Sequence, residues 1–333
     1  MKTRVLFEME TSAPDDFLTL LWLSDHPDVE LLGVVVTPGM ADQMQLVRWA
    51  LDKCGREDVA IGSYTPLANM PGALPFEFRH VSGFHYKVYG EESIKSHPIG
   101  HVWWGAELMY NRLSVSNQGP ATVLTGAPPK NFGACLESYG AGLEGCELRW
   151  VLQGGFAGDN LVEPAHRLAK FNGRTHCPSF NPGGAHKATL ALLADKQIFA
   201  RRLLVSKNVC HGVTWTQADH AAWVVDCAAA HQADMFQWLK VLPYRPEPAV
   251  PGIRKGLQWL RHGLECYLRD KGEGKAMHDL VAATCVLDES VCSFVEVEVE
   301  RVKGEWGAHP VEGTGTWISV AGDKGRFLKV LAR

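Results

Sequence analysis

The stretch "RVLFEMETSAPDDFLTLLWL" (residues 4–23) places a short apolar run before a group of carboxylates, and a longer apolar run after it. Residues 4–9 are typical of a buried strand, and the apolar residues from about Asp15 to Leu23 indicate a helix. Four acids crowd the point where this strand ends: Glu8, Glu10, Asp15 and Asp16. This crowding predicts a polar site at the end of a buried strand.

The alternation of apolar strands and helices continues over the first two thirds of the chain. Further strands are predicted at 30–37, 58–62, 121–125, 148–153 and 201–209, and helices at 43–54, 103–113, 129–138 and 184–195. Strands that are apolar throughout and separated by helices are typical of a parallel sheet covered on both faces. We therefore predict an α/β fold with an open, mainly parallel sheet flanked by helices, as a single domain over residues 1–333.

Other segments follow different patterns. Residues 63–102 are rich in Pro, Gly, His and aromatic residues without a clear period, and we interpret them as a lid, because long loops are often functional. Three helices are predicted late in the chain, at 217–240, 252–270 and 275–286. Residues 293–302 alternate Val with Glu, and with 315–322 they predict an antiparallel hairpin at the edge of the sheet.

Composition limits the class of function. Hydrophobic residues make up 46% and charged residues 21%, as in a soluble globular protein. A net charge of −4 without a Lys/Arg block argues against a nucleic-acid or membrane partner, so a small ligand fits better. No apolar run suits a signal peptide or a membrane span. Nine scattered cysteines without a C-x-x-C pair indicate reduced thiols in a cytoplasmic protein.

The acids of residues 8–16 have two interpretations. Like charges this close raise one another's pKa unless a cation compensates them, and the segment contains no Lys or Arg. A hard divalent cation with oxygen ligands would compensate, and a main-chain carbonyl such as that of Thr125 would add a ligand. Alternatively, Asp15 and Asp16 cap the following helix while Glu8 and Glu10 are solvated.

Six short motifs occur in the order and at roughly the intervals of the inosine-uridine type nucleoside hydrolases. They are EMETSAPDD (8–16), VTPG (36–39), LTGAPPKN (124–131), QGGFAGDN (153–160), SFN (179–181) and HD (278–279). From residue 4 to about 286 the chain thus resembles a divergent member of this family. The resemblance implies an open α/β fold with a Rossmann-like core and hydrolysis of the N-ribosidic bond of nucleosides by a Ca²⁺-bound water.

The resemblance also implies roles for individual residues. It assigns a Ca²⁺ ion to the side chains of Glu10, Asp16 and Asp279 and to the carbonyl of Thr125. Glu10 would be the general base on the water, and His278 would face the leaving base. The candidate substrate contacts are Asp15, Asn160, Phe180, Asn181 and Met40, although Phe180 and Met40 could be packing residues and the two Asn could be turn residues. A homo-oligomer, dimer or tetramer, is expected because the family forms them.

The chain departs from the family pattern at several positions. The family motif is D-x-D-P-G-x-D-D, whereas this chain has Glu8 and Glu10 and one extra residue. Met40 and Ser179 stand where the family has Asn and Glu. These departures predict a modified nucleoside or related N-riboside as substrate, with apolar surface near Met40. Two alternatives remain: a catalytically silent nucleoside-binding homologue, and a metal-dependent phosphohydrolase, which the lack of a basic residue near the acids disfavours.

Overall fold

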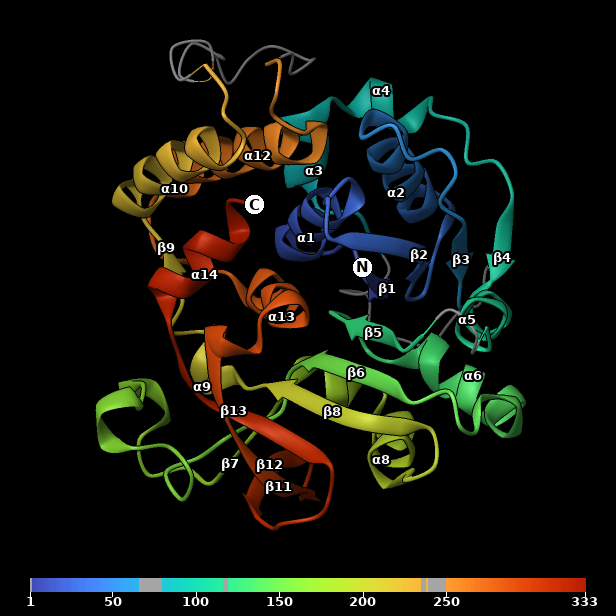
Figure 1. Cartoon of the computed structure of the whole chain (residues 1–333), viewed down its shortest axis with the longest axis vertical. Helices are drawn as coiled ribbons and strands as arrows, with labels where there is room; N and C mark the ends of the chain where they lie inside the picture. The colour runs from blue at the N-terminus through green and yellow to red at the C-terminus, as the bar shows by residue number, and fades with distance from the viewer. Residues whose placement is uncertain (1, 66–79, 116–118, 235–237, 239–249) are drawn as a thin grey trace.

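An eleven-stranded sheet forms the centre of the fold in the computed structural model, which describes residues 2–65, 80–115, 119–234, 238 and 250–333 (Figure 1). Its strands are β1 (Thr3–Met9), β2 (Val29–Val36), β3 (Ile61–Ser63), β4 (Val102–Trp104), β5 (Ala121–Thr125), β6 (Leu148–Gln153), β7 (His176–Cys177), β8 (Phe199–Val205), β11 (Cys292–Val302), β12 (Glu305–Pro310) and β13 (Thr316–Gly322). A separate two-stranded sheet pairs β9 (Thr214–Trp215) with β10 (Lys275–Ala276).

The strand order is β4-β3-β2-β1-β5-β6-β8-β13-β11-β12-β7. Every pair from β4 to β13 is parallel, and the three pairs from β13 to β7 are antiparallel. This arrangement confirms the predicted open, mainly parallel sheet with an antiparallel C-terminal part.

The strand order reverses between β1 and β5. The chain first adds β2, β3 and β4 on one side of β1 and then returns to place β5 on the other side. The connections on the two sides of such a point diverge and leave a crevice beyond the carboxyl ends of the strands, where ligands bind in open α/β sheets. The acids that follow β1 therefore lie at this crevice.

The predicted hairpin is antiparallel, but its position at the edge of the sheet is wrong. Residues 293–302 and 315–322 pair as β11 and β13, and β13 joins the parallel part through β8. An unpredicted strand, β12, pairs with the other side of β11, and β7 pairs with β12. The two predicted strands therefore pair inside the sheet and are not consecutive, and the hairpin of this region is formed by β11 and β12.

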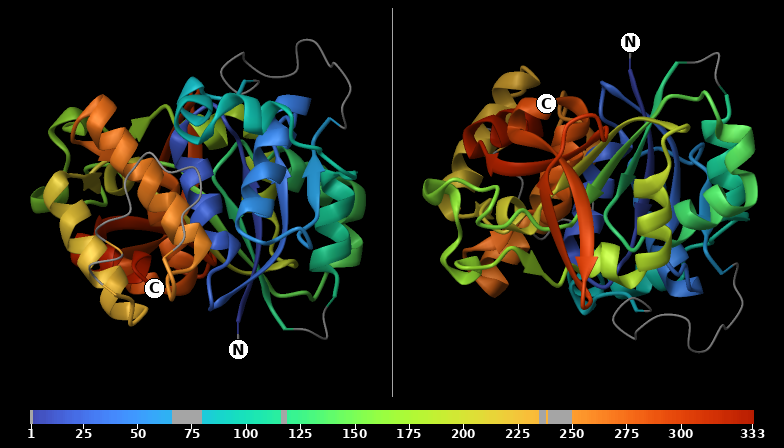
Figure 2. Two further views of the ribbon diagram at one scale, coloured as in Figure 1. Left: turned by 90° about the horizontal axis from the view of Figure 1, so that it is seen from above. Right: turned by 90° about the horizontal axis from the view of Figure 1, so that it is seen from below.

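Helices cover both faces of the sheet (Figure 2). On one face lie α1 (Pro14–Ser24), α2 (Ala41–Lys53), α12 (Lys255–Lys271) and α13 (His278–Leu287). On the other lie α5 (Gly105–Leu113), α6 (Lys130–Tyr139) and α8 (His186–Ala194). The remaining α-helices are α3 (Gly83–Tyr89), α4 (Glu91–Lys95), α7 (Phe180–Gly184), α9 (Lys207–Cys210), α10 (Gln217–Ala230) and α14 (Lys324–Leu331).

The segment predicted as a lid has more regular structure than expected. Its described part contains α3, α4 and β4, and β4 pairs with β3 at one end of the sheet. Residues 66–79 of this segment lie outside the described residues. The aromatic and Gly-rich composition of the segment therefore did not exclude short helices and a strand.

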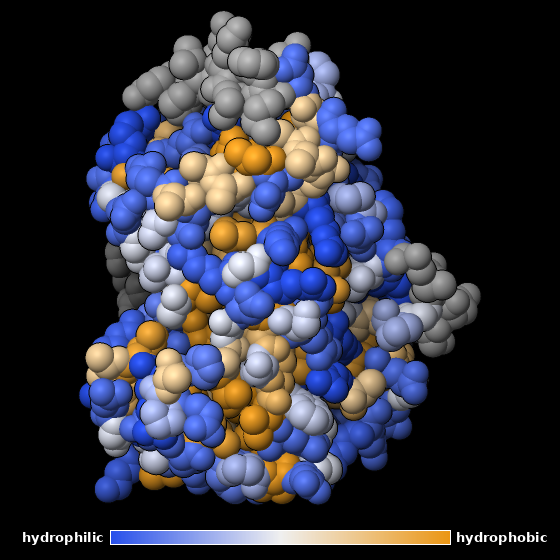
Figure 3. Space-filling model, turned by 60° about the vertical axis from the view of Figure 1, so that its left-hand side comes forward, coloured by the Kyte–Doolittle hydropathy of each residue, from blue (hydrophilic) through white to orange (hydrophobic). Residues whose placement is uncertain are grey.

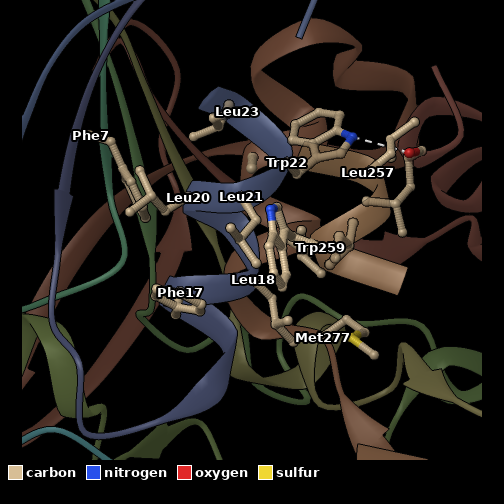
Figure 4. Packing of buried hydrophobic residues seen from close by; sticks show 14 of the residues in the cluster. Phe7, Phe17, Leu18, Leu20, Leu21, Trp22, Leu23, Leu257, Trp259 and Met277 are labelled. Atoms are coloured by element: carbon tan, nitrogen blue, oxygen red, sulfur yellow. Dashed lines mark hydrogen bonds between the residues drawn. The ribbon is translucent and has the colours of Figure 1, made fainter. Parts of the chain in front are cut away.

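Helix α1 is held in the core by apolar residues on all its sides. Phe17, Leu18, Leu20, Leu21, Trp22 and Leu23 are fully buried (Figure 4). Trp22 donates its indole N–H to the carbonyl of Leu331 at 3.1 Å, which satisfies the polar atom of this buried ring. Trp259 of α12 lies beside the helix in Figure 4, and α1 also packs on α13. This packing fixes the first turn of α1, which carries Asp15 and Asp16.

The surface is of mixed character. Figure 3 shows one face, where hydrophilic side chains border smaller groups of apolar ones. Among the described residues, the large hydrophobic side chains that are exposed are Phe180, Leu190, Val225 and Val302. All nine cysteines are described, and none forms a disulfide. Within the described part of the chain, every helix is too short or too polar to cross a membrane.

The contact between α12 and α1 gives a prediction about stability. A Cβ on Gly256 of α12 would lie 2.1 Å from the carbonyl oxygen of Leu21, so Gly256→Ala must push the helices apart. We expect the free energy of unfolding in urea to fall by roughly 1–3 kcal/mol, the usual cost of overpacking. Gly83→Ala in α3 is the matched control, because a Cβ there meets no atom within 4 Å. Equal effects of the two substitutions would contradict the close contact.

Candidate active site

The site lies where the carboxyl ends of β1 and β5 meet. Glu10 directly follows β1, and Thr125 is the last residue of β5. The main-chain N–H of Gly126 donates to the carbonyl of Glu8 at 2.9 Å, which keeps the two strand ends together. Both ends therefore border the crevice that the strand order creates.

Three carboxylates from two helices converge above these strand ends. Asp15 and Asp16 lie in the first turn of α1, and Asp279 lies in the first turn of α13. One oxygen of each carboxylate lies within 4.8 Å of the other two, and each residue is at most 5% exposed. Glu10 does not belong to this group of three, but its main-chain N–H donates to Asp16 Oδ1 at 3.2 Å, and its charge raises the pKa of Asp16 and Asp279. We call these four residues the acid cluster.

Burial and repulsion shift the pKa values in the acid cluster. Burial, with the charges of Asp279 and Glu10, raises the pKa of Asp16 well above its ordinary 3.8. Burial, with the charges of Asp15 and Glu10, does the same for Asp279, and burial raises the pKa of Glu10 to about 7. Asp15 behaves differently: burial raises its pKa, but the charges of Lys275 and His278 outweigh burial and lower it. Lys275 Nζ lies 3.6 Å from Asp15 Oδ1.

The acid cluster fits a hard divalent cation. Asp279 Oδ1 is buried and accepts no hydrogen bond from the described residues. A Cβ on Gly126 would lie 2.7 Å from Asp16 Oδ1 and 2.9 Å from Asp279 Oδ1, so the main chain after β5 borders the same space. The hydroxyl of Thr125 accepts the indole N–H of Trp150 at 3.0 Å, which fixes the last residue of β5 directly before Gly126. Carboxylate and carbonyl oxygens are ligands that Ca²⁺ and Mg²⁺ prefer.

A second group of potential ligands suits a metal less well. Cys210, His211 and His278 also offer atoms within 4.8 Å of one another, and Cys210 Sγ lies 3.2 Å from His278 Nδ1. However, Lys170 Nζ lies 2.8 Å from His211 Nδ1, and burial, His278, Lys170 and Lys207 lower the pKa of His211 to about 3. Burial is the largest cause that keeps His211 neutral, and the nearby charges of Lys170 and Lys207 would repel a cation.

A cavity of about 360 Å³ brings most of the predicted residues together. Its lining comprises Glu10, Ser12, Ala13, Asp15, Asp16, Gly126, Gln153, Ser179, Phe180, Asn181, Lys207, His211, His278 and Asp279. Asn181 is fixed by its amide, which donates to the carbonyls of Gly126 at 2.8 Å and Gln153 at 3.0 Å. A larger cavity of about 650 Å³ lies between α6 and α8, and among the described residues of its lining Glu137 is the one acid.

Two predicted substrate contacts do not line this cavity. Asn160 donates its side-chain amide to the carbonyl of Ala308 at 2.8 Å, which ties the loop after β6 to β12. Met40 precedes the first residue of α2 and is partly buried. Phe180, by contrast, lines the cavity and is 52% exposed.

The expectation that no basic residue lies near the acids is wrong. Lys207 lines the cavity, and Lys275 forms the ion pair with Asp15. Strand β8 ends at Val205, four residues before the predicted end, so Lys207 follows a strand end, where site residues were expected. Lys275 reaches the site because β10 pairs with β9, and strands of two residues leave no periodic signal in a sequence.

Comparison with solved structures identifies the fold. The chain is similar to a plant nucleoside hydrolase over 100% of its length and 98% of that chain, with 16% identity and a TM-score of 0.60. It is similar to an inosine-uridine preferring nucleoside hydrolase from Bacillus anthracis over the same shares, with 14% identity and a TM-score of 0.63. The chain is also similar to a purine-preferring ribonucleoside hydrolase from Gardnerella vaginalis. The match covers 99% of this chain and 97% of that chain, with 14% identity and a TM-score of 0.59.

No protein-family model matches the sequence, and no curated protein matches it in a sequence search. The chain therefore has the nucleoside hydrolase fold at a sequence identity that leaves the activity to be argued from the site.

The raised pKa of Asp279 predicts how stability depends on pH and calcium. A carboxyl group whose pKa is raised on folding has no effect below its ordinary value of 3.8, destabilises the protein increasingly as the pH rises from there to the raised pKa, and keeps that full effect at higher pH. In chelator at pH 8, Asp279→Asn should therefore unfold at a higher temperature than the wild type. In millimolar Ca²⁺ the order should reverse, because the variant lacks a ligand.

The control for this experiment is Asp226→Asn on an exposed position of α10, which should leave both melting temperatures unchanged. Differential scanning calorimetry measures all three proteins. A wild type more stable than Asp279→Asn even in chelator would contradict uncompensated repulsion in the acid cluster.

Proposed function

We propose that the chain hydrolyses the N-ribosidic bond of a nucleoside or related N-riboside, with Ca²⁺ held by the acid cluster. One observation carries this proposal: the acid cluster and His278 face the same cavity beyond the carboxyl ends of β1 and β5. The similarity to nucleoside hydrolases in fold supports it.

The ion would be held by oxygen atoms alone. Glu10, Asp16 and Asp279 would contribute carboxylates, and Thr125 its main-chain carbonyl. A bound divalent cation stabilises negative charge and lowers the pKa of a water that it binds. Ca²⁺ accepts six to eight oxygen ligands in flexible geometry, which suits carboxylates that come from a loop and two helices.

Glu10 is the candidate general base. Its carboxyl group lines the cavity together with Asp16 and Asp279, so a water held by the ion would lie within its reach. Its Oε2 accepts the main-chain N–H of Ser12, which orients the carboxylate. Glu10 would take a proton from the attacking water as the new C1′–O bond forms.

The other cavity residues would hold the two parts of the substrate. Asp15, whose pKa is lowered and which is therefore ionised at neutral pH, would accept hydrogen bonds from ribose hydroxyls together with Asn181. The neighbouring carboxylates would stabilise the positive charge that develops on the sugar as the C1′–N bond breaks. His278, whose pKa burial lowers, would be neutral and would donate a hydrogen bond to the leaving nitrogen. The base would take its proton from solvent, and Glu10 would release to solvent the proton that it takes from the water.

An assay of nucleosides tests the proposed activity. Purified protein with Ca²⁺ should release free base and ribose from at least one N-riboside, and Glu10→Gln should lower kcat/KM by about 100-fold or more, the range for loss of a general base. The control, Glu144→Gln, changes an exposed turn residue and should leave kcat/KM unchanged. Binding of nucleosides without release of base would indicate a silent homologue, and release of phosphate without base would indicate a phosphohydrolase.

A homo-oligomer in the cytoplasm is the assembly and location that we propose. The two outer strands of the sheet, β4 and β7, have only three and two residues. Strands this short limit edge-to-edge pairing, so contact through helices or loops fits a stable assembly better. Light scattering at micromolar concentration should give at least twice the mass of one chain, 36.7 kDa. A mass of one chain would exclude an oligomer at that concentration.

A further inference from the structure

Two lysine ammonium groups lie at one side of the cavity, Lys207 in its lining and the exposed Lys170 behind His211. Lys207 follows β8 and lines the cavity, and Lys170 lies in the short 3₁₀ helix Ala169–Phe171. Both ammonium groups contact the ring of Phe171, at 5.1 Å from its centroid for Lys170 and 5.7 Å for Lys207. Lys170 also contacts His211, which lines the cavity. Both positive charges therefore lie near the same part of the cavity and would attract an anion bound there.

Neither of these two lysines pairs with a carboxylate in the described part of the chain. Lys170 Nζ donates to His211 Nδ1 at 2.8 Å, and Lys207 Nζ donates to the carbonyl of Pro178 at 2.8 Å and lies 3.8 Å from Cys177 Sγ. Other lysines of the chain do form ion pairs: Lys87, Lys95, Lys275 and Lys324. The two charges at the cavity are therefore solvated or hydrogen-bonded to neutral groups, and they remain available to an anion.

The cavity residue beside Lys207 is also neutral. Ser179 follows Pro178, and its hydroxyl accepts the main-chain N–H of Gly155 at 3.0 Å. It stands where the resembled motif has Glu, a residue whose charge would neutralise Lys207 and repel an anion. The acid cluster, in contrast, contains all the carboxylates of the lining. Within the residues that the structure describes, the cavity thus has an acidic group and a basic group without an acidic partner.

We propose that Lys207 and Lys170 form a subsite for an oxyanion on the substrate, so that the preferred N-riboside carries a negatively charged group. Charge-assisted hydrogen bonds from ammonium to carboxylate or phosphate oxygens are about twice as strong as neutral ones. The charge is either a phosphate on the ribose or a carboxylate on the base, and both use the same chemistry at the lysines. This inference names the substrate class of the proposed hydrolase and so rests on that function.

Three substrates with one pyrimidine ring separate the possibilities. Uridine is neutral, orotidine adds a carboxylate to the base, and uridine 5′-monophosphate adds a phosphate to the ribose. In the wild type, kcat/KM for at least one anionic substrate should exceed that for uridine by about tenfold or more, the size expected of one charged hydrogen bond. The anionic substrate with the higher kcat/KM shows whether the subsite binds a group on the base or on the ribose.

Variants test whether the lysines cause this preference. Lys207→Gln and Lys170→Gln should each lower the ratio of kcat/KM for the anionic substrate to that for uridine by about tenfold. High salt should lower the same ratio in the wild type, because it screens charges at an open cavity. Lys196→Gln is the matched control: this exposed lysine precedes β8, at the opposite end of the strand from Lys207, and its ratio should equal that of the wild type.

The outcomes distinguish this inference from the proposed function. Hydrolysis of uridine with no preference for either anion, and no change in Lys207→Gln, would overturn the anion subsite and leave the hydrolase standing. Absence of hydrolysis, with calorimetric binding of an anionic substrate that Lys207→Gln weakens, would support the subsite and overturn the hydrolase. Absence of both binding and hydrolysis for all three substrates would overturn both.

Discussion

The burial of four carboxylates at the junction of β1 and β5 is the constraint on which the rest of the structure depends. An isolated buried charge costs far more than a folded domain can normally tolerate, so such groups are paired, metal-bound or neutralised. The apolar sides of α1 prevent Asp15 and Asp16 from turning outward, because the helix is packed in the core. Among these four residues Lys275 forms an ion pair with Asp15, and its effect on the pKa of Asp279 is outweighed by burial and by the charges of Asp15 and Glu10. Compensation for Glu10, Asp16 and Asp279 must therefore come from protons or from a bound cation.

Other features of the fold also serve this site. Two helices, α1 and α13, direct their N-termini at the acid cluster, and the partial positive charge of a helix N-terminus favours carboxylates. Gly126 lets the main chain after β5 approach them. The small β9–β10 sheet then connects the segment with Lys207 and His211 to the segment with Lys275 and His278. One cavity thereby contains a group that suits a cation and a group that suits an anion.

The sequence predicted the central part of this arrangement because the signals there are local. Strands β1, β5 and β6 each contain a short apolar run, and the polar residues of the site lie at or directly after their ends, so both the strands and their ends were recognisable. Strand β8 was predicted four residues too long, because Lys207 and Val209 continue its pattern of basic and apolar residues. The pairing of Lys275 with Trp215 joins segments sixty residues apart through tertiary contacts, and no local pattern indicates it. The motif that contains Asn160 indicated a loop residue after β6 but not the direction of its side chain. The side chain donates to the carbonyl of Ala308, a contact that the sequence does not indicate.

The central claim is that the acid cluster binds a calcium ion. Crystals grown with Ca²⁺ and measured at a wavelength where calcium scatters anomalously would locate the ion directly. The account predicts one strong peak per chain, between the carboxylates of Glu10, Asp16 and Asp279 and close to the carbonyl of Thr125. No peak at the acid cluster, or a peak only beside Cys210 and His211, would contradict it.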